Sequence, residues 1–177
     1  MFPKPDWVCF DLDPGSGAFA DAARAASHVK DALDKLHLDS FPKTSGSRGL
    51  HIFVPLRLGP TADQVLQFAE QFVARVAAAH PKEMTVEHSI KARGQRVYLD
   101  AFRNGSVQTV VAPYSVRRKP HAPISTPLAW SEVKPSLVPA KFNLVNYREI
   151  FKKQDPWGGF FGSRQSLRDA ARQLKTL

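Results

Sequence analysis

The sequence has little of several features that would place it in a membrane, secreted or repetitive class of protein. No run approaches the roughly 18 consecutive apolar residues that a membrane-spanning helix requires. The opening residues, MFPKPDWVCFDLDPG, lack a basic segment followed by the apolar stretch of a signal peptide. There is no internal repeat and no low-complexity tract. We therefore expect a cytoplasmic protein with no membrane partner.

Cysteine is almost absent: the chain has one, Cys9, which excludes an internal disulfide. Cys9 lies inside the apolar run WVCF, where a small buried side chain is the expected role. Acidic residues are also scarce relative to basic ones, since 25 Lys and Arg against 16 Asp and Glu leave a formal charge of +9. This balance favours a polyanionic partner without specifying which one. A length of 177 residues with 43% hydrophobic content predicts one compact domain, residues 1–177.

The first predicted strand runs from Trp7 to Asp13 and carries two carboxylates on one face. Alternation places Val8, Phe10 and Leu12 on one side and Asp11 and Asp13 on the other. Two carboxylates on one face are placed to bridge divalent cations. The alternative is a solvated or turn-capping pair of aspartates, because the D-x-D pattern is common by chance.

Regular elements are predicted after this strand. A helix face from Ala22 to Leu36 has apolar spacings of four, three, four and three residues. The next strand, Leu50–Leu56, directs an aliphatic row toward the core and His51 away from it. A T-x-x-Q capping box at Thr61 then begins a second amphipathic helix that runs to about His80.

The second half of the chain shows weaker patterns. An antiparallel hairpin is predicted from Arg96–Arg103 and Ser106–Ala112, because the Asn104-Gly105 dipeptide suits a two-residue turn. Six prolines between Pro113 and Pro139 predict an extended crossing over the surface. The segment Ser163–Leu177 predicts a closing helix.

Asp100 strengthens the metal hypothesis, because it ends the apolar strand Val97-Tyr98-Leu99. A third carboxylate from a neighbouring strand is what a two-metal phosphoryl-transfer site needs to neutralise the attacking and leaving oxygens.

A small-residue loop, KTSGSRGLH, lies between these acids and carries the cations Lys43 and Arg48. Its amides and cations predict a cradle for a triphosphate, although a flexible basic turn is the alternative. It does not match the G-x-x-x-x-G-K-[ST] phosphate loop. His51 could donate to phosphate oxygens or simply be a packed or surface histidine. The other five histidines show no metal-ligand spacing and are interpreted as incidental.

Three motifs occur in a fixed order: FDLDPG, KTSGSRGLHIFVPL and RVYLDAFRNGSVQTVVAPYSVRRKPHAPISTPLAW. In this order the chain resembles the polymerase domain of bacterial ATP-dependent DNA ligase D, a member of the archaeo-eukaryotic primase superfamily. The resemblance runs from Pro5 to about Trp157. It implies an α/β (α+β) fold, a mixed and mainly antiparallel sheet of primase type flanked by helices.

The resemblance also implies roles for individual residues. Asp11, Asp13 and Asp100 match the catalytic metal ligands, and Ser45, Arg48 and His51 match residues that hold the incoming triphosphate. Arg103 and Arg117 match basic positions that contact nucleotide phosphates or the primer. Lys91, Arg93 and Arg96 match a basic approach to the third motif, with a solvated charged face as the alternative.

The implied function is metal-dependent extension or filling of DNA ends in non-homologous end joining. The implied cofactor is Mn²⁺ or Mg²⁺, and the implied partners are DNA ends, nucleoside triphosphates with ribonucleotides preferred, the end-binding protein Ku and a DNA ligase domain. The implied location is bacterial, cytoplasmic and nucleoid-associated. Family members normally carry a sizeable segment before FDLDPG, so a catalytic core without that segment is expected here. The rival functions are a non-catalytic DNA-end-binding remnant and a metal-dependent nuclease.

Overall fold

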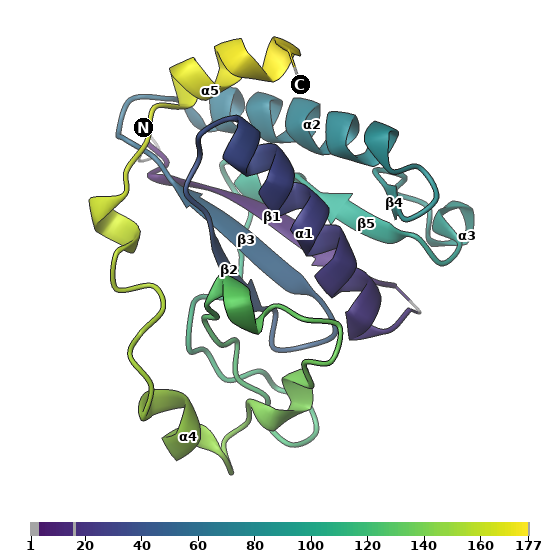
Figure 1. The fold of residues 1–177 in the computed structure, drawn as a ribbon, viewed down its shortest axis with the longest axis vertical. Helices are drawn as coiled ribbons and strands as arrows, with labels where there is room; N and C mark the ends of the chain where they lie inside the picture. The colour runs from purple at the N-terminus through teal and green to yellow at the C-terminus, as the bar shows by residue number, and fades with distance from the viewer. Residues whose placement is uncertain (1–3, 16, 177) are drawn as a thin grey trace.

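The computed structural model describes residues 4–15 and 17–176, and its centre is a five-stranded sheet in the order β2-β3-β1-β5-β4 (Figure 1). The strands are β1 Trp7–Asp13, β2 Phe41–Thr44, β3 Leu50–Pro55, β4 Met84–Thr85 and β5 Val97–Asp100. Neighbouring strands pair antiparallel except for β4 and β5, which pair in parallel. The mixed, mainly antiparallel sheet of the α/β (α+β) prediction is therefore observed.

Five α-helices accompany the sheet in the described residues: α1 Phe19–Lys35, α2 Ala62–Ala79, α3 Ile90–Arg93, α4 Tyr147–Phe151 and α5 Leu167–Gln173. Short 3₁₀ turns lie at Phe102–Asn104, Trp130–Glu132, Pro139–Lys141, Phe160–Gly162 and Leu174–Thr176. In the described part of the chain, no helix combines the length and apolarity needed to cross a membrane.

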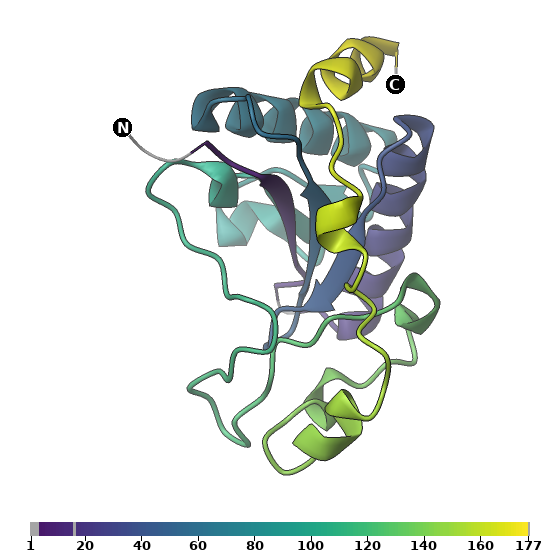
Figure 2. The same ribbon diagram turned by 90° about the vertical axis from the view of Figure 1, so that its left-hand side faces the viewer.

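Helices α1 and α2 cover one face of the sheet, and α5 lies beside α2 (Figures 1 and 2). Val8, Phe10 and Leu12 of β1 point into this layer and are completely buried. The opposite face carries a smaller aromatic cluster around Cys9, Phe53 and Phe160. The two-sided alternation predicted for Trp7–Asp13 is confirmed, and Cys9 is a buried apolar residue as expected.

Both predicted long helices are present with nearly the predicted bounds. The hydroxyl of Thr61 accepts the N–H of Gln64, and the Gln64 side chain accepts the N–H of Thr61. This capping box satisfies two amides that have no partner inside the helix. Helix α2 ends at Ala79 with His80 as its cap. The helix also contacts β4.

The hairpin predicted around Asn104-Gly105 is wrong. Gly105 has a φ of −66°, and Asn104 is not among the residues with positive φ, so the dipeptide does not form a type I′ turn. Asn104 is instead buried, and its side-chain amide bonds both the N–H and the carbonyl of Cys9 at 2.8 Å. The amide thus substitutes for a neighbouring strand, and residues 106–112 form no strand.

The proline-rich segment is extended, but it does not simply cross the surface. Residues 124–128 run beside β2, where the N–H of Thr44 bonds the carbonyl of Thr126 and the N–H of Leu128 bonds that of Pro42. Ser125 and Thr126 are consequently buried. The closing helix is shorter than predicted, since α5 begins at Leu167 and a 3₁₀ turn follows it; residue 177 lies outside the described residues.

Candidate active site

A cavity of about 590 Å³ lies on the face of the sheet opposite α1 and α2. Every predicted site residue except Asp100 lines it, and Asp100 lies next to it on β5. The lining comprises Asp11, Asp13, Ser45, Ser47, Arg48, Gly49, His51, Arg103, Thr109, Val110, Val111 and Arg117. Segments up to about 100 residues apart in sequence therefore form one polar, concave surface.

Asp11 and Asp100 face each other across the β1–β5 pair, because the antiparallel register places them directly opposite. The Nε of Arg103, on the 3₁₀ turn after β5, lies 3.4 Å from a carboxylate oxygen of each. Burial alone would raise the pKa of Asp11, but His51 and Arg103 outweigh it and hold that pKa below its usual value. Burial, assisted by the charge of Asp11, raises the pKa of Asp100. Two acids with opposite shifts are typical of a functional carboxylate pair.

Asp13 belongs to the same cavity but is placed differently. Its side chain is 44% exposed, accepts the N–H of Gly15 and faces Arg93 at 3.7 Å. The three aspartates do not form a closed ligand set: among the described residues, only His28, His80 and Glu83 bring three ligand atoms within 4.8 Å of one another. An ion shared by all three aspartates would require Asp13 to turn toward Asp11.

The loop between β2 and β3 is held in shape by Ser45. Its hydroxyl accepts the N–H groups of Ser47 and Gly49, and its own N–H donates to the carbonyl of Gly49. Arg117 donates from Nη1 to the Ser45 carbonyl at 3.2 Å. Arg48 is exposed at the cavity, free to meet an anion there. The loop is thus part of the cavity wall and is held by its own hydrogen bonds.

Gly49 allows this loop to pass close to β1, since a Cβ at residue 49 would lie 2.2 Å from the carbonyl oxygen of Leu12. The carbonyl belongs to the backbone and the position of the Cβ is fixed by the backbone, so neither atom can rotate away. We expect Gly49→Ala to destabilise the fold by about 1–3 kcal/mol, the usual cost of overpacking. Urea unfolding measures this effect. Gly162→Ala, where an added Cβ meets nothing within 4 Å, is the control and should change stability little.

Lys43 does not have the role that the sequence suggested. It is completely buried and does not line the cavity, so it is not available to an incoming triphosphate. Its Nζ donates to Ser125 Oγ at 2.6 Å and lies 3.0 Å from Nδ1 of His51. The hydroxyl of Ser125 in turn donates to the carbonyl of Thr44. Lys43 therefore acts on the cavity through His51.

This contact determines how His51 faces the cavity. An ammonium group only donates, so Nδ1 of His51 is the acceptor and the ring proton lies on Nε2. Nε2 lies 3.4 Å from Asp11 Oδ1. Burial lowers the pKa of His51, so the neutral ring acts on Asp11 as a donor and not as a charge. A neutral donor fixed in this tautomer is suited to a phosphate oxygen.

The sequence patterns did not predict that Lys43 supports His51 or that Ser125 accepts a hydrogen bond from Lys43. The pairing of Lys43 with His51 across β2 and β3 has no signal in residue spacing. Of the flanking cations, Arg93 bonds the carbonyls of Glu87 and His88, and Arg96 bonds those of Ala92 and Arg93. These two arginines brace the short α3 segment as well as carrying charge.

Two of the histidines interpreted as incidental lie together in the structure. His28 and His80, 52 positions apart in the sequence, meet at Glu83 on the helix side of the sheet. Residue spacing could not reveal this group, because it depends on how α1 packs against α2.

Comparison with known proteins assigns the family. The model of the "LigD, primase-polymerase domain" matches residues 2–157. The bifunctional non-homologous end joining protein LigD of Bacillus subtilis is 33% identical over 165 residues, 92% of this chain. The multifunctional LigD of Mycolicibacterium smegmatis is 30% identical over 171 residues, 96% of this chain. The chain spans only 27% and 22% of the lengths of these two curated relatives.

A solved structure agrees with the sequence comparisons. The polymerase domain of Mycobacterium tuberculosis ligase D, in complex with DNA, superimposes with a TM-score of 0.81 at 30% identity. The match covers 92% of this chain and 57% of that one. The sequence motifs, the sheet that carries them and these comparisons agree that the chain belongs to the family of LigD primase-polymerase domains.

Proposed function

We propose that this protein is a metal-dependent nucleotidyltransferase that extends or fills DNA ends in non-homologous end joining. The observation that carries the proposal is the cavity itself, which carboxylates on β1 line together with Ser45, Arg48, His51 and Arg117. Acids and donors around one cavity suit a divalent cation and a polyphosphate bound together. We also propose that residues 1–177 form one catalytic core.

The donor set fits hard divalent cations, because Asp11, Asp13 and Asp100 offer carboxylate oxygens and no sulfur. Arg103 supports this assignment: it lies between Asp11 and Asp100, where positive charge is needed. We propose Mn²⁺ or Mg²⁺ held by these three acids in a two-metal arrangement. When bound, the ions supply charge neutralisation and lower the pKa of a primer 3′-hydroxyl.

The remaining residues would position the nucleotide. His51 presents its Nε2–H, and Arg48 and Arg117 present fixed positive charge to a triphosphate. Ser45 orders the loop that lines the same cavity, because its hydroxyl accepts the N–H groups of Ser47 and Gly49. Arg103 would contact nucleotide or primer phosphates once cations replace it between the acids. Donors fixed in advance in this way stabilise the charge that develops on departing pyrophosphate.

The proposed substrates are DNA ends and nucleoside triphosphates, with ribonucleotides preferred, and the proposed partners are Ku and a DNA ligase domain. The formal charge of +9 supports a nucleic-acid ligand. The similar polymerase domain from M. tuberculosis has been solved in complex with DNA. The names of the B. subtilis and M. smegmatis relatives place those proteins in end joining.

A labelled primer incubated with this protein, nucleotides and Mn²⁺ tests the proposal. Extension of the primer is the expected result. Shortening would instead establish a nuclease, and binding without any change in length would establish a non-catalytic end-binding protein. Either of these two results would overturn the polymerase assignment.

The cavity wall makes a prediction about ligand selectivity. We expect His51→Ala and Arg117→Ala each to weaken nucleotide binding about 10-fold or more, because each removes a hydrogen bond to a charged group worth about 1.5–3 kcal/mol. DNA affinity should change far less. Parallel titrations with nucleotide and with DNA measure both effects, and Arg75→Ala on the exposed surface of α2 is the matched control. If these variants bound nucleotide normally but lost DNA, the assigned roles would be reversed.

A further inference from the structure

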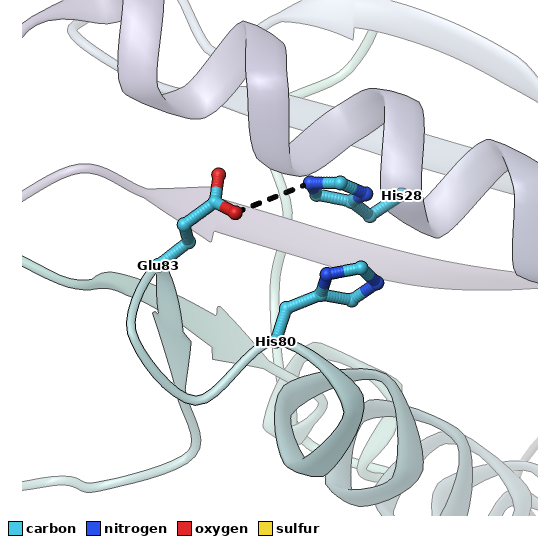
Figure 3. A group of neighbouring side chains, drawn as sticks. All are labelled: His28, His80 and Glu83. Atoms are coloured by element: carbon cyan, nitrogen blue, oxygen red, sulfur yellow. Dashed lines mark ion pairs between the residues drawn. The ribbon is translucent and has the colours of Figure 1, made fainter.

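A second group of metal-ligating side chains lies on the other side of the sheet from the acids. It consists of His28 on α1, His80 at the end of α2, and Glu83 in the turn before β4 (Figure 3). One ligand atom from each residue lies within 4.8 Å of the other two. We propose that these three residues bind a divalent ion of the zinc class, independently of the proposed nucleotidyl-transfer site.

The distances between the ligand atoms are compatible with such an ion. A tetrahedral ion with bonds of about 2.0–2.2 Å to nitrogen and oxygen separates its ligand atoms by about 3.3–3.6 Å. Nε2 of His28 and Oε1 of Glu83 are 3.6 Å apart. The two imidazole rings stack at 3.7 Å between centroids, with 24° between their planes, and lie one above the other beside Glu83 (Figure 3). The two rings would have to leave this stack, by side-chain rotation, before a nitrogen of each could point at one ion.

The backbone already holds the three positions together. The carbonyl of His80 accepts the N–H groups of Glu83 and Met84, which fixes the turn between the two ligands. Met84 is completely buried in the edge strand β4, and Val29, next to His28, is completely buried on the inner face of α1. Binding would therefore order side chains only, so little conformational entropy opposes it.

No other contact within the described residues accounts for the ring of His80, which has the stack on His28 but no hydrogen-bond or ion-pair partner. The Glu83 carboxylate has His28 as its ion-pair partner, and Arg24, which lines a pocket with Glu83, is paired with Asp21. The side chains of His28 and Glu83 are 27% and 46% exposed, so an ion can enter from solvent.

The donor set selects the class of ion. Two imidazole nitrogens and one carboxylate favour Zn²⁺ and its borderline neighbours over Mg²⁺ and Mn²⁺, which prefer oxygen ligands. Three protein ligands leave a fourth position for water. An ion there would join α1 to the α2–β4 turn, in place of the present ring stack and His28–Glu83 contact.

Zn²⁺ titration by calorimetry, at neutral pH, tests the proposal. We expect one Zn²⁺-binding event that is at least 10-fold weaker in His28→Ala and in His80→Ala and is retained in Asp11→Asn. His37→Asn is the matched control, because it removes an exposed imidazole outside the group while tolerating the positive φ of that position. Undiminished Zn²⁺ binding in both alanine variants, or its loss in Asp11→Asn alone, would overturn the proposal.

A second measurement covers the case in which the alanine variants fold poorly. In Asp11→Asn, which keeps the three ligands, the ring resonances of His28 and His80 should shift together on addition of Zn²⁺ and remain unchanged with Mg²⁺. Shifts confined to His51 or to other histidines would rule out binding at this group.

Discussion

Asp11→Asn is expected to reduce nucleotide addition by at least about 10²–10³-fold, because it removes a charge that serves metal binding and charge neutralisation in the transition state. The substitution keeps the shape of the side chain, and its one amide oxygen can still accept from either Arg103 or His51. The fold should therefore survive, and circular dichroism should be unchanged. Single-turnover primer extension with Mn²⁺ measures the loss. Asp100→Asn should behave in the same way, since its amide oxygen can still accept the N–H of Phe102.

The control is Asp31→Asn, which changes an exposed acid on α1 outside the site and should leave activity near wild type. Mn²⁺ provides a second measurement. An ion that binds only the folded state at 100 times its Kd stabilises it by about 2.7 kcal/mol, so the melting temperature of the wild type should rise. Near-normal activity in Asp11→Asn, or a wild-type melting temperature indifferent to Mn²⁺, would contradict the assignment of the acids.

Lys43→Met is expected to lower nucleotide addition about 10-fold or more while leaving the protein folded. The variant removes the donor that fixes the proton of His51 on Nε2, so the ring no longer presents a defined donor to the cavity. The fold should survive because methionine fills a similar volume and requires no desolvated ammonium group, which offsets the lost donor to His51. Nitrogen chemical shifts of the His51 ring should show the lost preference for one tautomer.

The pH dependence of stability provides an independent test of Lys43. Burial, with a smaller contribution from Arg117, lowers the pKa of Lys43 from 10.5 to about 8. Between these values the unfolded chain binds a proton that the folded protein does not, so this group makes the folded state more stable as pH rises. The interval corresponds to about 3 kcal/mol, of which about 2 kcal/mol should appear between pH 8 and 9.5.

Urea unfolding of wild type and Lys43→Met at both pH values isolates this contribution, because all other groups cancel in the difference. The stability of the wild type relative to the variant should increase with pH. The exposed Lys82→Met is the control and should show no such trend. A constant difference between wild type and Lys43→Met would mean that Lys43 is not a perturbed buried base.

Local patterns were sufficient for much of the fold. The strands at Trp7–Asp13 and Leu50–Pro55 follow from alternation, and α1 and α2 follow from apolar spacing and a capping box. These signals involve residues at most a few positions apart, so the sequence displays them directly. The resemblance to the primase-like family then indicated which residues form the site.

Features that depend on distant partners were not predictable. Asn104-Gly105 has the composition of a hairpin turn, but the Asn104 amide pairs with Cys9, 95 residues away. Lys43 has the sequence context of an exposed cation in a phosphate loop, but it is buried and donates to Ser125, 82 residues later. In both places the local sequence pattern does not predict the structure, because a buried polar group forms a hydrogen bond with a partner that can lie anywhere in the chain.

By itself, the sequence determined which residues carry charge on the open face of the sheet: Asp11 and Asp13 by their two-residue spacing, and Asp100 by ending a strand. Only the tertiary structure decided how these charges are balanced. It placed Arg103 between Asp11 and Asp100, buried Lys43 behind His51, and brought His28 and His80 to Glu83. The physical reason is the distance along the sequence over which each signal acts. Side-chain alternation repeats every two residues, whereas strand register and helix packing across the whole chain set the positions of charges and metal ligands in space.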